Sequence, residues 1–87
     1  MKHAGPEALD ALEPILREIR KLAGLKEKNR GTFYRGSNAF LHFHEDPAGM
    51  FADLKLRGEF VRFRVSTKSE IAAMLREARR ENGSWFC

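Results

Sequence analysis

Two histidines separated by one residue, His42 and His44, are the side chains of this sequence best suited to chemistry. They lie in residues 40–65, where apolar and polar residues alternate almost throughout. That period of two predicts strands with one buried face, and it places both imidazoles on the opposite face. Zinc and related ions accept such nitrogen ligands, and Glu45, Asp46 and Asp53 offer carboxylates nearby. Without a third histidine or a cysteine pair in the motif, His42, His44 and Asp53 form a weak candidate metal site.

A row of side chains across the predicted sheet gives a second chemical hypothesis. If Arg57-Gly58 and Ser37-Asn38 are two-residue hairpin loops and 45–50 is a six-residue loop, the strands align in one register. The row that results is Phe33, His42, Asp53 and Arg62. A histidine beside a carboxylate can transfer protons, but the sequence shows neither a nucleophile nor a substrate pocket. A solvated ladder of opposite charges is the simpler interpretation, and we predict no catalytic residue.

Four strands and two helices must position these side chains. We predict strands at about 31–36, 39–45, 50–56 and 59–65, with 26–31 as a polar loop. Apolar residues at spacings of three and four predict a first helix at about 7–24, which begins near Pro6 or at Asp10. Thr67 followed by Glu70 is a capping box and predicts a second helix at about 68–82. The tail, 83–87, either packs Trp85 and Phe86 on the core or stays loose.

The predicted fold is therefore an α+β two-layer sandwich, in the order helix-β-β-β-β-helix. Its sheet is a four-stranded antiparallel meander with both helices on one face. The register places these residues on the buried face: Tyr34, Leu41, Phe43, Ala52, Leu54, Val61, Phe63 and Val65. The open face is predicted to carry Phe33, Arg35, Phe40, His42, His44, Phe51, Asp53, Lys55, Phe60, Arg62 and Arg64.

Composition limits the classes of function. The chain has 87 residues, enough for one small domain, with 43% hydrophobic and 32% charged residues and a formal net charge of +4. Its apolar runs are shorter than the roughly 20 residues of a membrane span, and the first residues lack the pattern of a signal peptide. We therefore expect a cytoplasmic protein that does not interact with membranes. The single cysteine, Cys87, has no partner for an internal disulfide.

The open face leads to a ranking of binding functions. Aromatic side chains among cations are found at protein interfaces, so a protein partner or a homodimer is our first prediction. The same mixture can stack bases and neutralise phosphates, which makes nucleic-acid binding the alternative. Metal binding and proton transfer come after these, and no cofactor is predicted.

The segment Phe33-Tyr34-Arg35, followed by the residues AFLHFHEDPAG at 39–49 and FADL at 51–54, resembles a family of short uncharacterised bacterial proteins. The resemblance extends from about residue 31 to the second helix and implies no particular activity. The order of elements is more distantly similar to the YjbR and frataxin-like two-layer domains. Members of the YjbR group are often labelled as candidate DNA-binding proteins. The acidic helix that frataxin-like proteins use for iron is missing here, because the first helix carries Arg17, Arg20 and Lys21 among its acids.

Overall fold

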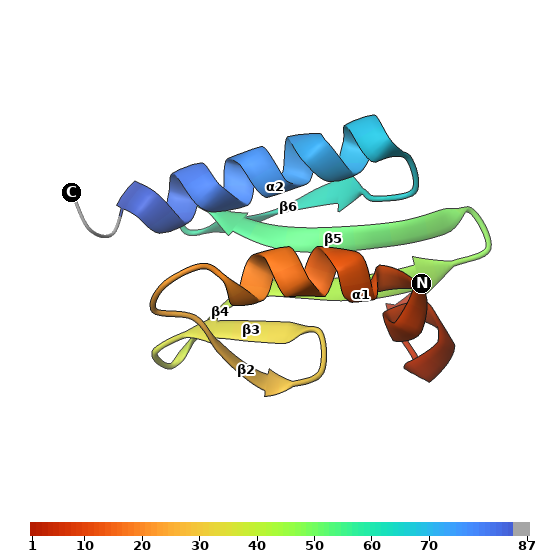
Figure 1. Ribbon diagram of the computed structural model, residues 1–87, viewed down its shortest axis with the longest axis horizontal. Helices are drawn as coiled ribbons and strands as arrows, with labels where there is room; N and C mark the ends of the chain where they lie inside the picture. Colours follow the sequence, from red (N-terminus) through yellow and green to blue (C-terminus); the bar gives the residue numbers. More distant parts are fainter. Residues whose placement is uncertain (85–87) are drawn as a thin grey trace.

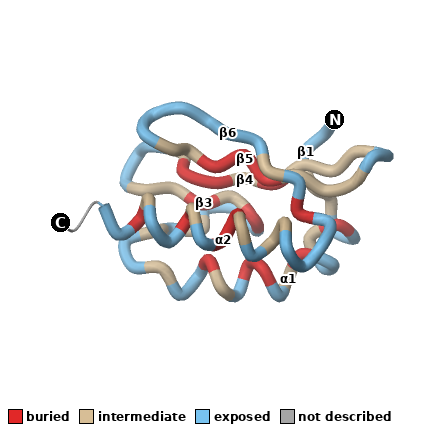
Figure 2. Tube along the Cα trace, turned by 90° about the horizontal axis from the view of Figure 1, so that it is seen from above, coloured by how far each residue is buried: buried red, intermediate tan, exposed pale blue. Residues whose placement is uncertain are grey.

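Two helices lie on the same side of one antiparallel sheet in the computed structural model, which describes residues 1–84 (Figures 1 and 2). The elements are β1 (Lys2–His3), α1 (Pro6–Arg20), β2 (Lys26–Asn29), β3 (Thr32–Arg35), β4 (Asn38–Asp46), β5 (Gly49–Leu56), β6 (Glu59–Arg64) and α2 (Lys68–Gly83). The α+β class and the antiparallel sheet are confirmed. The helices and the sheet enclose one core, which includes Leu16, Ile19, Leu41, Leu54 and Met74.

Local sequence signals account for both helices. Pro6 occupies the first turn of α1, where a missing N–H costs no hydrogen bond, so the helix begins at Pro6 and not at Asp10. It ends at Arg20, four residues before the end predicted from Gly24, and it contains Pro14. In α2 the capping box is formed as predicted: the Glu70 backbone N–H donates to the Thr67 hydroxyl, and the Glu70 carboxylate accepts from the Thr67 backbone N–H. Neither helix within residues 1–84 is long and apolar enough to cross a membrane.

Within residues 1–84 the sheet has six strands, so the predicted count of four was wrong. Its order is β2-β3-β4-β5-β6, and β1 pairs with β4 outside this path. Residues 26–29, predicted to be part of a loop, form the edge strand β2. All four residues of β2 are polar, so no alternating pattern marks a buried face. The strand β1 has only two residues, both exposed, and it lies beside His44 and Glu45 of β4.

The predicted registers of the β4–β5 and β5–β6 pairs are confirmed. His42 lies opposite Asp53 in the β4–β5 pair, and Asp53 lies opposite Arg62 in the β5–β6 pair. The turn between β4 and β5 is shorter than predicted, because Asp46 and Gly49 already pair with each other. Three of the four residues in the predicted row therefore do lie side by side across the sheet.

The predicted register of β3 against β4 was wrong. The turn is centred on Gly36-Ser37, with Arg35 opposite Asn38, and Gly36 has a positive φ of 61°, which glycine adopts without strain. Beyond this turn a β-bulge leaves Phe40 without a partner on β3, and Phe33 lies opposite Leu41. A shift of one residue exchanges the faces of a strand. Phe33 and Phe40, predicted on the open face, are core residues with exposed fractions of 1% and 3%.

The structure also places other side chains differently from the prediction. Arg35 extends toward α2, where its Nη2 donates to the Asn82 carbonyl at 3.5 Å, so it does not belong to the open face. Val61 was predicted to be buried, but it is 40% exposed because β6 is an edge strand. Tyr34 and Phe63 are only partly buried. The prediction for Trp85 and Phe86 lies outside the described residues.

Candidate metal centre

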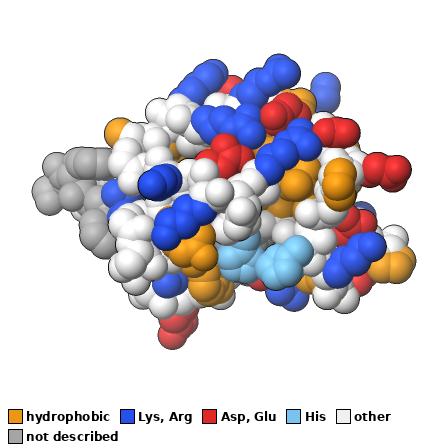
Figure 3. Space-filling model, turned by 90° about the horizontal axis from the view of Figure 1, so that it is seen from below, with side chains coloured by type: hydrophobic (Ala, Val, Ile, Leu, Met, Phe, Trp, Pro, Cys, Tyr) orange, Lys and Arg blue, Asp and Glu red, His pale blue; other side chains and the backbone are white. Residues whose placement is uncertain are grey.

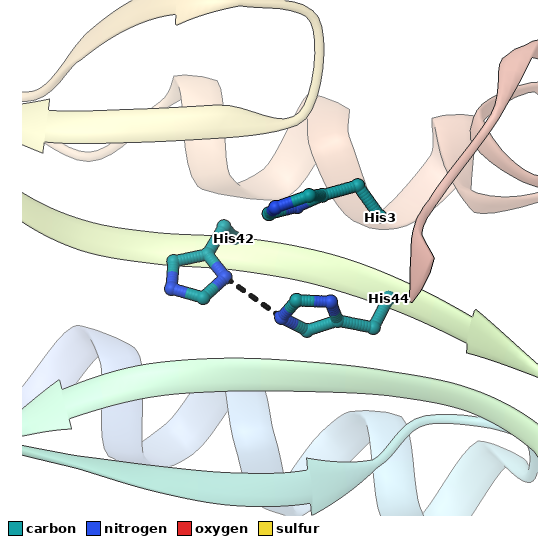
Figure 4. Close-up of side chains that lie close together, drawn as sticks. All are labelled: His3, His42 and His44. Carbon is teal, nitrogen blue, oxygen red and sulfur yellow. Dashed lines mark hydrogen bonds between the residues drawn. The ribbon is translucent and has the colours of Figure 1, made fainter. Parts of the chain in front are cut away.

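All three histidines of the chain meet on the face of the sheet that the helices leave open (Figure 4). His42 and His44 are two residues apart on β4, so their side chains lie on the same face. His3 belongs to β1 and lies directly opposite His44. One possible ligand nitrogen from each imidazole lies within 4.8 Å of the other two. The centre is therefore built from two segments that are far apart in the sequence.

Two of the imidazoles and one carboxylate are in close contact. His42 Nδ1 and His44 Nε2 are 3.0 Å apart, and His44 Nε2 lies 3.0 Å from Asp53 Oδ2. The distance from His42 Nδ1 to the same carboxylate oxygen is 4.0 Å. In the tautomer of His44 that carries its proton on Nε2, that N–H has two possible acceptors, His42 Nδ1 and Asp53 Oδ2.

Asp53 is fixed in this position by Arg62. The arginine donates from Nε to Oδ1 at 2.8 Å and from Nη2 to Oδ2 at 2.9 Å, which is the paired geometry typical of guanidinium and carboxylate groups. Hydrogen bonds from Arg62 are the largest cause that lowers the pKa of Asp53 from its usual 3.8. Asp53 is only 7% exposed, so this ionised carboxylate is a buried negative charge beside the imidazoles.

Burial keeps His42 in the form that binds metals. Desolvation is the largest influence on its pKa and lowers it from 6.5, while the charge of Asp53 acts in the opposite direction. The neighbouring His44, His3 and Arg62 lower the pKa of His42 further. At pH 7 the His42 imidazole is therefore neutral, with a lone pair available on one ring nitrogen.

Two of these distances are close to those around a tetrahedral ion. Ligand atoms about 2.05 Å from zinc are roughly 3.3 Å apart in a regular tetrahedron. His44 Nε2 lies 3.0 Å from both His42 Nδ1 and Asp53 Oδ2, whereas the 4.0 Å between His42 Nδ1 and Asp53 Oδ2 and the limit of 4.8 Å among the three imidazoles are wider, so the side chains must rotate inward to close around an ion. An ion bound at this place would replace the shared ring proton and neutralise the carboxylate. Imidazole-rich sites favour zinc, copper or nickel, whereas magnesium and calcium prefer oxygen ligands.

The rest of the open face is a mixture of aromatic and basic side chains, as predicted, with fewer aromatics. The Phe60 ring lies 4.9 Å from the His42 ring, and the Lys55 ammonium lies 5.0 Å from the Phe60 ring. Phe51 is partly buried opposite His44, and Arg64 lies opposite Phe51 on β6. Figure 3 shows the histidines together at the surface, with hydrophobic side chains and lysine or arginine side chains nearby.

Sequence reasoning missed His3, the third imidazole. Its one signal was that the chain contains another histidine, and nothing near His3 predicted a strand that pairs with β4. The predicted candidates Glu45 and Asp46 have other partners. Glu45 Oε2 accepts from the Gly5 backbone N–H at 2.6 Å, and Asp46 Oδ2 accepts from the Ala48 backbone N–H at 3.1 Å.

No family model, curated protein or solved structure matches this chain in the comparisons with known proteins.

Proposed function

We propose that this protein binds a divalent transition-metal ion, with zinc as the best fit, through His3, His42 and His44. Asp53 is the fourth ligand in this proposal. The observation that carries it is the convergence of three imidazole nitrogens within 4.8 Å of one another. Arg62 remains bonded to Asp53 Oδ1 and orients the carboxylate, as outer hydrogen bonds do at many metal sites.

Zinc titration by calorimetry tests the proposal. The wild-type chain is expected to bind one zinc ion, with no binding of magnesium under the same conditions. We expect His44→Ala to weaken zinc binding by at least about tenfold, because even outer partners of a metal contribute roughly 10- to 100-fold. Lys55→Ala is the control, since Lys55 is on the same face, its ammonium lies over the Phe60 ring, and it is not one of the four proposed ligands. Equal zinc affinities for the wild type and His44→Ala would exclude this centre.

Cobalt offers an independent test of the geometry. A cobalt ion in a tetrahedral site absorbs visible light much more strongly than one in an octahedral site. We expect the wild type to give the strong spectrum and His42→Ala to lose intensity. A weak, octahedral spectrum in the wild type would contradict the tetrahedral arrangement.

A second candidate is self-association or binding of a protein partner, the function ranked first from the sequence. The observation that favours it is the exposure of Phe60 (45%) and Val61 (40%) on the edge strand β6. Phe60→Ser is the informative variant, because a change at the buried Phe40 would disturb the core instead. Sedimentation should show a concentration-dependent mass for the wild type that Phe60→Ser reduces; a monomer at all concentrations would remove support for self-association. Nucleic-acid binding has less support from the structure than from the sequence, because two of the four phenylalanines predicted on the open face, Phe33 and Phe40, lie in the core.

A further inference from the structure

The strand β1 is held to the sheet by few interactions, which include long ion pairs of Lys2 with Glu45 (3.9 Å) and of the Met1 ammonium with Asp46 (3.5 Å). Its register with β4 covers two residue pairs, Lys2 with Glu45 and His3 with His44. Beyond β1, the Ala4 backbone N–H donates to the Phe43 carbonyl at 3.1 Å. Both residues of β1 are exposed. A short exposed strand of this kind opens at low free-energy cost compared with the core of the protein.

The two faces of β4 hold this segment in different ways. On the helix side, the Glu45 carboxylate accepts from the Gly5 backbone N–H at 2.6 Å. Gly5 is the N-cap residue of α1 and has no side chain that could cap the helix. On the open side, the contact is made by His3, whose ring centroid lies 4.8 Å from that of His44 (Figure 4). Among residues 1–84, strand pairing and ring packing on His42 and His44 hold His3 there.

An ion at the proposed centre would shift the equilibrium between the docked and the detached states of β1. His42, His44 and Asp53 belong to β4 and β5, which pair over six residue positions, so these ligands are in place whether or not β1 is docked. His3 is the one ligand that arrives with β1. A metal bond to His3 therefore exists only in the docked state, and a ligand shifts an equilibrium toward the state that it binds better.

We infer that metal binding tightens the docking of the N-terminal strand: the ion joins His3 to β4 and so lowers the frequency with which β1 and the start of α1 detach from the sheet. This inference rests on the proposed metal-binding function. It adds a regulatory output to that function, because occupancy of the centre lowers the population in which the β4 edge at residues 43–45 is exposed. Coupling of this kind is reciprocal. The factor by which His3 strengthens metal binding equals the factor by which the metal favours docking, provided that β1 is mostly docked without metal.

Hydrogen exchange at the Ala4 amide, measured by NMR with and without saturating zinc, tests the inference. Zinc is expected to slow exchange at Ala4 in the wild type by about the same factor that separates the zinc affinities of the wild type and His3→Ala. In His3→Ala, zinc should still bind through the remaining ligands and leave exchange at Ala4 unchanged. The Ile71 amide, which donates to the Thr67 carbonyl in α2, controls for stabilisation of the whole protein.

A second variant separates docking from ligation. Glu45→Ala removes the acceptor of the Gly5 N–H without removing a metal ligand. Glu45→Ala is expected to speed exchange at the Ala4 amide without metal, which measures the loss of docking. If docking and binding are coupled, it weakens zinc binding in the wild-type background in proportion to the docked fraction that is lost, and it has no effect in the His3→Ala background. An equal effect in both backgrounds would contradict the coupling.

The possible failures are distinguishable. If zinc binds and shifts the His42 and His44 signals while Ala4 exchange stays the same, the docking inference is wrong and the proposed metal binding stands. If zinc does not bind the wild type at all, the proposed function fails and the docking inference fails with it.

Discussion

Replacement of Asp53 by asparagine probes the most highly connected side chain of the centre. Asp53 accepts two hydrogen bonds from Arg62, at 2.8 and 2.9 Å, and its Oδ2 lies 3.0 Å from His44 Nε2. Asparagine has nearly the same shape, but it carries no charge and presents an NH₂ group to at least one of these donors. The variant therefore removes the electrostatic contribution with little change in packing.

The size of the effect follows from the burial of the two partners. A hydrogen bond to a charged group contributes about 1.5–3 kcal/mol to stability. Asp53 is buried, but the Arg62 side chain is 52% exposed and regains water when its partner is lost. We therefore expect Asp53→Asn to lower the free energy of unfolding by about 1.5 kcal/mol, at the bottom of that range. For a domain of this size, that loss corresponds to a decrease in Tm of roughly 6–12 °C.

The stability difference between the wild type and Asp53→Asn should depend on pH in a defined direction. The pKa of Asp53 is lower in the folded protein than its ordinary 3.8, chiefly because of the hydrogen bonds from Arg62. Its contribution to stability is therefore complete above the unfolded pKa and is lost as the pH falls through the folded value. The difference between the wild type and Asp53→Asn should persist at pH 7 and shrink in acid below 3.8.

Urea denaturation followed by circular dichroism, with EDTA present, measures this difference. Glu59→Gln is the matched control, because Glu59 is an exposed carboxylate on the neighbouring strand β6. Equal urea midpoints for the wild type and Asp53→Asn at pH 7 would refute the reasoning, and so would a difference that does not change with pH.

Three further predictions concern the fold. Phe33→Ala should lower the free energy of unfolding, measured by urea denaturation, by about 3–5 kcal/mol, because Phe33 is a core residue. A loss below about 0.5 kcal/mol is typical of an exposed position and would contradict the register of β3. Thr67→Ala should lower the stability by about 1 kcal/mol through loss of the capping box, again measured with urea, and an unchanged midpoint would contradict it. Glu27→Gln should destabilise the protein at pH 7, and this effect should fade as the pH drops below 4.5, because hydrogen bonding to Arg20 lowers the pKa of Glu27. Thermal melts across this pH range measure the difference in Tm between the wild type and the variant. A difference that stays constant with pH would contradict a stabilising Glu27–Arg20 pair.

The alternating pattern of the sequence predicted the middle of the sheet well. A two-residue turn at Arg57-Gly58 and a buried face on β5 predict one register, in which apolar residues pair at 54 with 61 and at 52 with 63 and opposite charges pair at 53 with 62, and the observed pairs follow it. The same alternation and turns predict the row of His42, Asp53 and Arg62, which the structure confirms. Here the period of two and the turn chemistry act together, so the register is strongly specified.

The side of the sheet formed by β1, β2 and β3 could not be predicted in this way. The turn at Gly36-Ser37 and the bulge at Phe40 together move Phe33 into the core, and no alternation shows where a bulge occurs. The strand β2 carries no apolar pattern, and β1 is too short to have one. The third histidine was missed for this last reason, because His3 reaches the centre only through the pairing of β1 with β4.

The most direct test of the metal centre is an NMR titration of the histidine ring signals with zinc. We expect the signals of His3, His42 and His44 all to change, with the changes complete at one zinc ion per chain. Magnesium at the same concentrations should leave them unchanged. Ring signals that do not respond to zinc, or that drift without saturation as more zinc is added, would contradict a site built from these three imidazoles.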